Sequence, residues 1–515
     1  MDILFARNLG EAGLNCLLLP VFNDKKAFEY VPELARNLPW LQNSPALADF
    51  RAKKDETALL YGPPEALKDA PLPRLLLVGL GKRDDFKPQV LRDAVAAGMK
   101  ACLALKLEKP GLSLEVLPAL AGAGKTAPDQ AQLAEEAVLG ALLALHYREI
   151  CQTPQAGDEA RVEPASLTLV GPASATGKDR AAVAKAQAVA HGMKLTRDLV
   201  NGPANQVTPA YLETRAQELA RAYGFSCTAL GPDYLRDEGF GAFCAVARGS
   251  RTEPRLIILE HRPQNPPKNL KPIVVVGKGV TFDSGGLCIK PAANMDNMKT
   301  DMAGAGTVIG LFAAFGEAMR TDETLKDRHL VGIMPCAENM PGGNATRPGD
   351  VVITLAGKTV EIINTDAEGR LLLCDALTLA QQRWDSAALI DLATLTGACV
   401  VALGEKTAGL FNNNDELRDR LMALGEKCGE RFWPMPIYDE DLIKGKTADL
   451  ANAGGRSGGA VFAAAFLKQF INEKTAWAHL DIAGPARLDE KTAICPGGAT
   501  AVCLRTLFEL VKQGL

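Results

Sequence analysis

The stretch from residue 272 to residue 291, PIVVVGKGVTFDSGGLCIKP, decides how the rest of the sequence is interpreted. It opens with a run of β-branched apolar residues that is typical of a buried strand. Lys278, Asp283 and Lys290 follow, with glycines between them. Because α/β proteins place their functional groups in loops at the carboxyl ends of buried strands, the stretch predicts an α/β fold with a functional loop at this point.

Further short apolar runs flank this stretch, and segments with helical spacing lie between several of them. A helix is also predicted to start at Thr208-Pro209, because proline is favoured in the first turn. This order of elements predicts a C-terminal α/β domain with a central sheet. We predict strands in RLIILEH (255–261), HLVGIMP (329–335), DVVITLAG (350–357), TVEIIN (359–364) and AALIDLAT (387–394), and helices over residues 303–320 and 369–384.

The first third of the chain shows a similar rhythm of strand-like and amphipathic runs, which predicts a smaller α/β domain. We therefore expect an N-terminal domain over residues 1–170, a linker helix over 171–200 and a larger domain over 201–515. The polar, proline-bearing segment 152–166 is expected to run over the surface. Gly79 and Gly81 invite a nucleotide-binding interpretation, but the third glycine of that fingerprint is missing.

Length and composition narrow the class of protein. The 515 residues exceed one ordinary core, so two domains are expected. The net charge of -4 gives no overall attraction to nucleic acid or to a membrane. The start MDILFARNLG lacks the pattern of a signal peptide, and the 12 cysteines contain no CxxC pair, so we expect reduced thiols and a cytoplasmic protein.

Carboxylates are the best candidates for metal ligands, because the chain has only 5 histidines and no two of them lie close in sequence. Asp301 precedes an apolar helix-like run, where a simple capping role is the alternative. Asp366, Glu368 and Arg370 alternate in EIINTDAEGR (361–370). In extended backbone they would face one side, whereas a solvated turn is the alternative.

If Asp283, Asp301, Asp366 and Glu368 cluster, they repel one another unless cations neutralise them. Two divalent ions would do so, and the oxygen ligands suit Mn²⁺, Mg²⁺ and Zn²⁺. A lysine amine is an unusual ligand that requires a lowered pKa.

Four motifs carry a resemblance to a known family: GKGVTFDSGG (277–286), KTDMAGA (299–305), NTDAEGRL (364–371) and WAHLDIAG (477–484). The sequence from NGPANQVTP (201–209) onward, including DLANAGGRSGGAVFAAAFL (449–467), resembles the leucyl aminopeptidase family, also called cytosol aminopeptidases or M17 metallopeptidases. The N-terminal third is similar only in outline. The resemblance implies two α/β domains, a smaller N-terminal macro-like domain and a larger C-terminal catalytic domain with a central mixed sheet.

The resemblance also assigns roles to residues. Two divalent metal ions, Mn²⁺ or Zn²⁺ with Mg²⁺ also compatible, are implied for each subunit. The tighter ion would be held by Lys278, Asp283, Asp301 and Glu368, and the more exchangeable ion by Asp283, Asp366 and Glu368. Lys290 and Arg370 would be catalytic, and the pocket for the first side chain would contain Met298, Thr394, Leu395 and Gly397.

The activity implied is the release of N-terminal residues, preferably Leu or Met but with broad specificity, from short peptides with a free N-terminus. Paired metals would activate water, and a bicarbonate ion at Arg370 would shuttle the proton. A homohexamer is also implied. Two other classes of function remain open at this stage, namely nucleic-acid binding, which the acidic balance disfavours, and phosphoester hydrolysis, which also uses clustered carboxylates.

Overall fold

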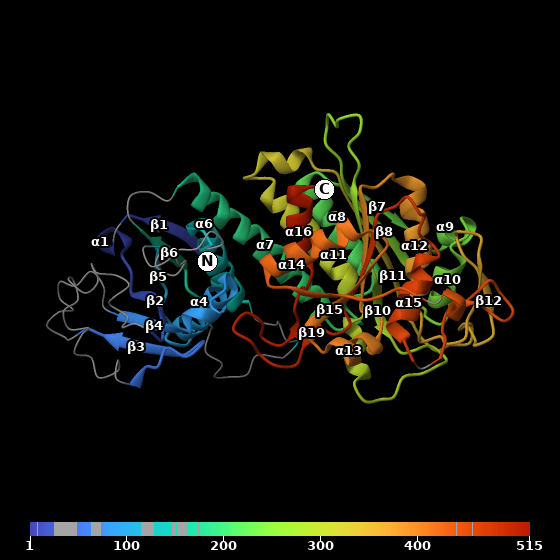
Figure 1. Cartoon of the computed structure of the whole chain (residues 1–515), viewed down its shortest axis with the longest axis horizontal. Helices are drawn as coiled ribbons and strands as arrows, with labels where there is room; N and C mark the ends of the chain where they lie inside the picture. The colour runs from blue at the N-terminus through green and yellow to red at the C-terminus, as the bar shows by residue number, and fades with distance from the viewer. Residues whose placement is uncertain are drawn as a thin grey trace. The chain divides into compact units, whose positions relative to one another are not determined.

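The computed structural model describes residues 1–7, 9–24, 49–62, 74–114, 128–146, 151, 162–171 and 176–515 except 439 and 456. The chain forms two compact units, Met1–Ala190 with Glu490–Pro496 and His191–Asp489 with Gly497–Leu515. The boundary between them falls inside helix α7 (Gly177–Asn201), which is visible in Figure 1. Most of the expected surface connection, residues 152–161, lies outside the described residues.

The smaller unit contains a six-stranded sheet within its described residues. Its order is β1 (Asp2–Ala6), β6 (Ser166–Val170), β5 (Pro110–Ser113), β2 (Cys16–Phe22), β4 (Arg74–Gly81) and β3 (Thr57–Tyr61). All neighbours pair in parallel except β3 and β4.

The helices of the smaller unit include α1 (Leu9–Ala12), α4 (Pro88–Ala104) and α6 (Gln130–Ala144), of which α4 and α6 pack on each other. Gly79 has a structural explanation, since a Cβ there would lie 1.9 Å from the carbonyl oxygen of Lys53. Close packing of backbone therefore accounts for this glycine without a nucleotide.

The larger unit is built on a nine-stranded mixed sheet within its described residues. Its order is β16 (Arg431–Pro434), β15 (Thr407–Asn412), β18 (Trp477–Asp481), β14 (Ala388–Ala393), β9 (Ile273–Gly277), β11 (Leu330–Asn339), β8 (Arg255–His261) and β7 (Ser226–Leu230), and β10 (Gly279–Asp283) also pairs with β11. The central strands β18, β14, β9 and β11 run parallel, so their carboxyl ends meet at one edge.

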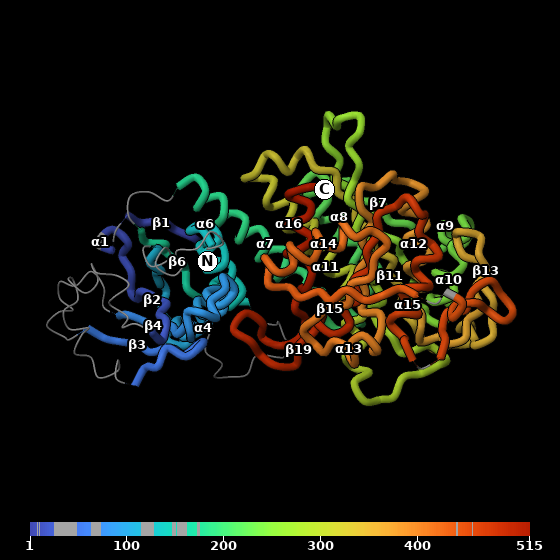
Figure 2. Tube along the Cα trace, viewed as in Figure 1, coloured from blue at the N-terminus to red at the C-terminus, as the bar shows by residue number. Residues whose placement is uncertain are grey.

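Helices cover both faces of this sheet. One layer contains α8 (Pro209–Tyr223), α11 (Ala303–Ala318), α14 (Asp415–Cys428) and α16 (Leu504–Gln513), and α16 packs between α11 and α14 (Figures 1 and 2). The other contains α9 (Pro232–Asp237), α10 (Gly241–Ala247), α12 (Gly369–Arg383) and α15 (Gly459–Lys468). Helix α13 (Gly397–Leu403) follows β14, and β12 (Val351–Ile353), β13 (Thr359–Glu361) and β17 (Leu450–Ala451) form a small separate sheet.

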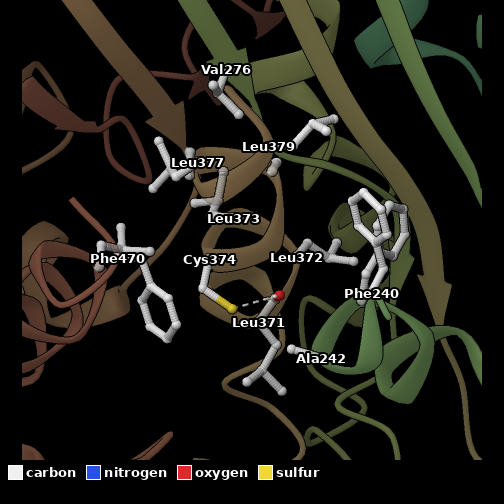
Figure 3. Packing of buried hydrophobic residues seen from close by; sticks show 14 of the residues in the cluster. Phe240, Ala242, Val276, Leu371, Leu372, Leu373, Cys374, Leu377, Leu379 and Phe470 are labelled. Carbon is white, nitrogen blue, oxygen red and sulfur yellow. Dashed lines mark hydrogen bonds between the residues drawn. The ribbon is translucent and has the colours of Figure 1, made fainter. Parts of the chain in front are cut away.

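The apolar core explains why these elements assemble. Figure 3 shows Leu372, Leu373 and Leu377 of α12 packed with Val276 of β9 and with Phe240, which precedes α10. All of these side chains are buried. Burying such a side chain contributes roughly 1.5–3 kcal/mol, so the cluster fixes α12 against the central strands of the sheet. The α/β fold class is thus confirmed.

Several local expectations hold in the structure. Thr208 caps α8 by accepting a hydrogen bond from the amide of Tyr211. None of the 12 cysteines forms a disulfide; Cys151 is exposed, Cys227, Cys244 and Cys288 are partly buried, and the others are buried. Among the described residues, no helix is both long and apolar enough to span a membrane.

Candidate metal centre

One cavity of about 570 Å³ opens where the loops after β9, β10 and β14 meet the segment before α12. Every site residue predicted from the sequence lines it. These residues are Lys278, Asp283, Lys290, Met298, Asp301, Asp366, Glu368, Arg370, Thr394, Leu395 and Gly397. Since they come from four separated stretches of sequence, the fold brings together groups that no local pattern connects.

Lys278 joins β9 to β10 and is 2% exposed. Its ammonium lies 2.8 Å from Asp301 Oδ1 and 2.7 Å from Glu368 Oε1, and it donates to the carbonyl oxygen of Thr394 at 3.0 Å. Burial opposes the charge of Lys278, but the carboxylates of Asp301, Glu368 and Asp283 outweigh it and raise its pKa. In the absence of metal, this ammonium is the counter-ion of the acids around it.

Asp301 does not cap a helix. Helix α11 begins at Ala303 without a side-chain cap, and Asp301 Oδ1 instead accepts from Lys278 and, at 2.8 Å, from Thr394 Oγ1. Asp301 Oδ2 is buried and has no hydrogen-bond partner. Burial raises the pKa of Asp301 well above its ordinary value, although Lys278 opposes the shift. A buried carboxylate oxygen without a donor is suited to a cation.

Asp283, at the end of β10, is held from two sides. Its Oδ1 accepts from the amide of Gly285 at 2.9 Å and from Asn339 Nδ2 at 2.7 Å. Its Oδ2 lies 2.8 Å from the ammonium of Lys290, which lies 2.5 Å from Asp366 Oδ1. These contacts fix the direction of the Asp283 carboxylate before any ion is bound.

Three carboxylates form a compact group. Asp283, Asp366 and Glu368 each offer one oxygen, and these oxygens lie within 4.8 Å of one another. Burial, followed by the charge of Asp283, raises the pKa of both Asp366 and Glu368. Hard oxygen ligands in this arrangement fit a divalent cation, which would relieve the repulsion that raises these pKa values.

The expected reason for the convergence of Asp366, Glu368 and Arg370 is wrong. The backbone at Glu368 is helical, with φ -77 and ψ -39, and α12 begins at Gly369, so Arg370 lies in the first helical turn. A turn followed by a helix start, and not alternation along a strand, brings these side chains to the cavity. Gly369 permits this approach, because a Cβ there would lie 2.6 Å from Lys278 Cε.

Arg370 is a buried cation at the positive end of a helix. Its Nη1 donates to the carbonyl oxygen of Asn452 at 2.8 Å, its guanidinium lies 5.5 Å from the ring centre of Phe462, and its Nε has no hydrogen-bond partner. Burial lowers the pKa of Arg370 to about 10, so it remains charged at neutral pH. The charge and the helix dipole together favour an anion beside it.

A second group of residues forms the more apolar part of the cavity. Met298, Leu395 and Gly397 line it with Val400 and Phe462, which the sequence did not reveal. A Cβ at Gly397 would meet open space, so this glycine leaves the cavity wider there.

Asp481, at the end of β18, holds the loop that carries Leu395. Its Oδ2 accepts from Thr396 Oγ1 at 2.7 Å, and its Oδ1 accepts from the amides of Leu395 at 3.4 Å and Ala483 at 3.1 Å. Asp481 is fully buried. The loop after β14 is therefore fixed by a strand that comes much later in the chain.

The fold and the cavity define a metal-dependent enzyme with an α/β catalytic unit and a site at the carboxyl ends of its parallel strands. Residues 194–508 match the sequence profile of the cytosol aminopeptidase family, catalytic domain, and residues 19–150 match that of the N-terminal domain. The chain belongs to the cytosol aminopeptidase family. It is accordingly a metallo-aminopeptidase, which hydrolyses peptides at their N-terminus, and the resemblance seen in its motifs is confirmed.

Individual relatives support this assignment over the full chain. A probable cytosol aminopeptidase of Nitratidesulfovibrio vulgaris is 50% identical over 520 residues, covering 100% of this chain and 99% of the relative. One from Oleidesulfovibrio alaskensis is 44% identical, with the same coverage of 100% and 99%.

Solved structures agree. The chain is similar to a tomato leucine aminopeptidase mutant, with a TM-score of 0.83 and 30% identity over 100% of this chain and 97% of that one. It is also similar to the bottromycin maturation enzyme BotP in complex with Mn, with a TM-score of 0.80 and 33% identity over 97% of this chain and 99% of that one.

Proposed function

We propose that this aminopeptidase releases N-terminal residues, preferably Leu or Met, from short peptides with the help of two divalent ions. The observation that carries the proposal is the group of oxygens from Asp283, Asp366 and Glu368 within 4.8 Å of one another, next to the unpartnered Oδ2 of Asp301. The four carboxylates carry more negative charge than the ammonium groups of Lys278 and Lys290 neutralise.

The residues divide between two ion sites. Lys278, Asp283, Asp301 and Glu368 would hold the tighter ion, and Asp283, Asp366 and Glu368 the more exchangeable one. When bound, the ions would supply a Lewis acid and lower the pKa of coordinated water towards about 7. Mn²⁺ is supported by the manganese complex of the similar BotP, while Zn²⁺ and Mg²⁺ suit the same oxygen ligands.

Lys290 and Arg370 are the proposed catalytic side chains. The ammonium of Lys290, beside Asp283 and Asp366, would stabilise negative charge on the oxygen of the scissile carbonyl. Arg370 is a poor base, since its pKa of about 10 keeps it protonated at neutral pH. Its guanidinium would instead hold bicarbonate, which would supply a relay for the proton from water to the leaving amine.

The first side chain of the substrate would occupy the part of the cavity lined by Met298, Thr394, Leu395 and Gly397. A thioether and a leucine side chain favour apolar residues such as Leu and Met. One methylene changes binding by only about 1–3 kcal/mol, so specificity is expected to be broad. The free α-amine of the peptide would bind at the ion site, which limits the enzyme to unblocked N-termini.

The proposals for the domain bounds, the oligomeric state and the location in the cell rest on membership of the family. We propose an N-terminal macro-like domain over residues 1–170, a linker helix over 171–200 and a catalytic domain over 201–515. A homohexamer is proposed and is tested by light scattering of the purified protein. The name of the relatives, cytosol aminopeptidase, supports a cytoplasmic location, which cell fractionation tests.

The test compares metal content and hydrolysis of leucine p-nitroanilide in the wild type, in Asp366→Ala and in Asp385→Ala. Asp385 is a matched control, because its side chain is 83% exposed and pairs with Lys271. We expect two ions per chain in the wild type and the control, and the loss of at least one ion and of activity in Asp366→Ala. Full activity of a metal-free preparation would contradict the proposal, and p-nitrophenyl phosphate in the same assay tests phosphoester hydrolysis.

A further inference from the structure

Asp366 and Glu368 lie on a segment that belongs to no strand or helix. Strand β13 ends at Glu361 and α12 begins at Gly369, so neither a sheet ladder nor a helix holds the backbone between them. A metal site needs its ligands fixed to within a fraction of an ångström. Some other group must therefore hold this segment.

Asn452 lies beside this segment as a result of strand pairing. Strand β17 runs parallel to β13, with Ala451 opposite Glu361, and the amide of Asn452 donates to the carbonyl oxygen of Glu361 at 3.0 Å. The next residue along the chain would continue the ladder, but β17 stops. The fully buried side chain of Asn452 continues the pairing in its place.

The side-chain amide of Asn452 uses all of its hydrogen-bonding capacity on the segment. Its Oδ1 accepts from the amides of Ile363 at 2.7 Å and Asn364 at 3.2 Å. Its Nδ2 donates to the carbonyl oxygens of Asn364 at 2.7 Å and Ala367 at 3.3 Å. Aspartate lacks the two donors, and leucine lacks donors and acceptors alike. Only a side-chain amide with the length of asparagine can therefore make all four hydrogen bonds to the segment.

Asn452 also contacts the guanidinium of Arg370, a proposed catalytic side chain. Its own carbonyl oxygen accepts from Arg370 Nη1 at 2.8 Å, whereas Arg370 Nε has no hydrogen-bond partner. One residue thus connects the backbone that carries Asp366 and Glu368 to the guanidinium of Arg370. Displacing it would move the carboxylates and the cation at the same time.

We propose that Asn452 is a positioning residue that sets the spacing between the Asp366 and Glu368 carboxylates and the Arg370 guanidinium. This inference rests on the proposed metal centre. Asn452 does not line the cavity, and acts by replacing the missing ladder of a neighbouring strand.

The test is Asn452→Asp, which keeps the shape and the acceptor but turns the donors towards Asn364 and Ala367 into acceptors. We expect the dissociation constant of the weaker Mn²⁺ ion, measured by calorimetry, to rise by about 10–100-fold, as for other groups that orient metal ligands. We also expect kcat at saturating Mn²⁺ to stay at least about tenfold lower, because Arg370 is displaced too. A general loss of stability would not produce both effects.

Thr506→Val is the matched control. Thr506 is also fully buried in the same unit, and its hydroxyl donates to Glu430 at 2.6 Å, away from the cavity. We expect this variant to unfold at a lower temperature but to keep the wild-type Mn²⁺ affinity within about twofold. Unchanged Mn²⁺ affinity and kcat in a folded Asn452→Asp protein would overturn the proposal, while a wild type that binds no metal would instead overturn the proposed function.

Hydrogen exchange of the wild type keeps the proposal testable if Asn452→Asp does not fold. The amides of Ile363 and Asn364 should exchange slowly although they lie outside any helix or strand, because both donate to Asn452 Oδ1. Exchange at the rate of an unstructured peptide would show that Asn452 does not hold these amides and would overturn the proposal.

Discussion

Replacing Gly369 by alanine tests whether the stem of Lys278 is fixed. An added Cβ would lie 2.6 Å from Lys278 Cε, 2.8 Å from its Nζ and 2.9 Å from its Cδ. A flexible lysine on the surface would move aside. Lys278 is buried, however, and Asp301, Glu368 and Thr394 hold its ammonium, so moving it breaks contacts that no solvent replaces.

The expected change in the free energy of unfolding is the difference between a gain in helix propensity and a cost of overpacking. Alanine in place of glycine stabilises a helix by about 1 kcal/mol. Overpacking a buried site costs about 1–3 kcal/mol. We therefore expect the free energy of unfolding of metal-free Gly369→Ala to fall by about 0–2 kcal/mol. Because Lys278 is a proposed ligand, the affinity for the tighter ion should fall more clearly, by about 10–100-fold.

The assay is thermal unfolding of the metal-free protein, followed by Mn²⁺ titration calorimetry. Gly177→Ala is the control, since Gly177 is the first residue of α7 as Gly369 is of α12, and a Cβ there would meet nothing within 4 Å. The control should be neutral or slightly stabilised and should keep its metal affinity. Gly369→Ala with unchanged or improved stability and metal affinity would refute the argument that Lys278 is held rigidly.

Three further outcomes are expected. Arg370→Ala should lower turnover and abolish any acceleration by bicarbonate; a mutant that still responds to bicarbonate would exclude this role. Gly397→Val should fill the open space at this position and lower kcat/KM for leucine p-nitroanilide by about tenfold or more, with a smaller loss for alanine p-nitroanilide, and equal losses would contradict the assignment of the pocket. Burial raises the pKa of Asp375 to about 7, although the amides of Leu355 and Phe243 oppose the shift. Because the folded state then binds the proton more tightly than the unfolded state, Asp375 should make the protein less stable as pH rises from about 4 to 7, and Asp375→Asn should flatten that slope in denaturant titrations at each pH.

Much of the metal centre could be predicted because its groups lie in short motifs next to strong strand signals. The apolar run before Lys278 and the run after Arg370 each predict their element without outside information. Loops at strand ends then place Lys278, Asp283 and Thr394 at one edge of the sheet. The α/β class follows from these local patterns, whereas the convergence of the site residues was predicted only from the resemblance to the aminopeptidase family.

The rest depends on contacts between distant parts of the chain. The conformation of Asp366–Arg370 was expected to be extended, but the backbone is already helical at Glu368, and Arg370 lies in the first turn of α12, which packs on Val276 and Phe240. The roles of Asn339, Asn452 and Asp481 had no local signal. Each of these polar side chains forms hydrogen bonds with groups far away in sequence. The spacing of residues along the chain does not reveal such contacts.

The late position of β18 in the chain has a consequence for biosynthesis. This strand inserts between β14 and β15, and its Asp481 holds the loop after β14. A nascent chain in which Lys278 and Asp366 have already been synthesised still lacks the middle of its sheet. The unfinished sheet has exposed strand edges, which are prone to aggregation until β18 arrives. Peptidase activity should therefore appear only after β18 has been synthesised, with no partly active fragment before it.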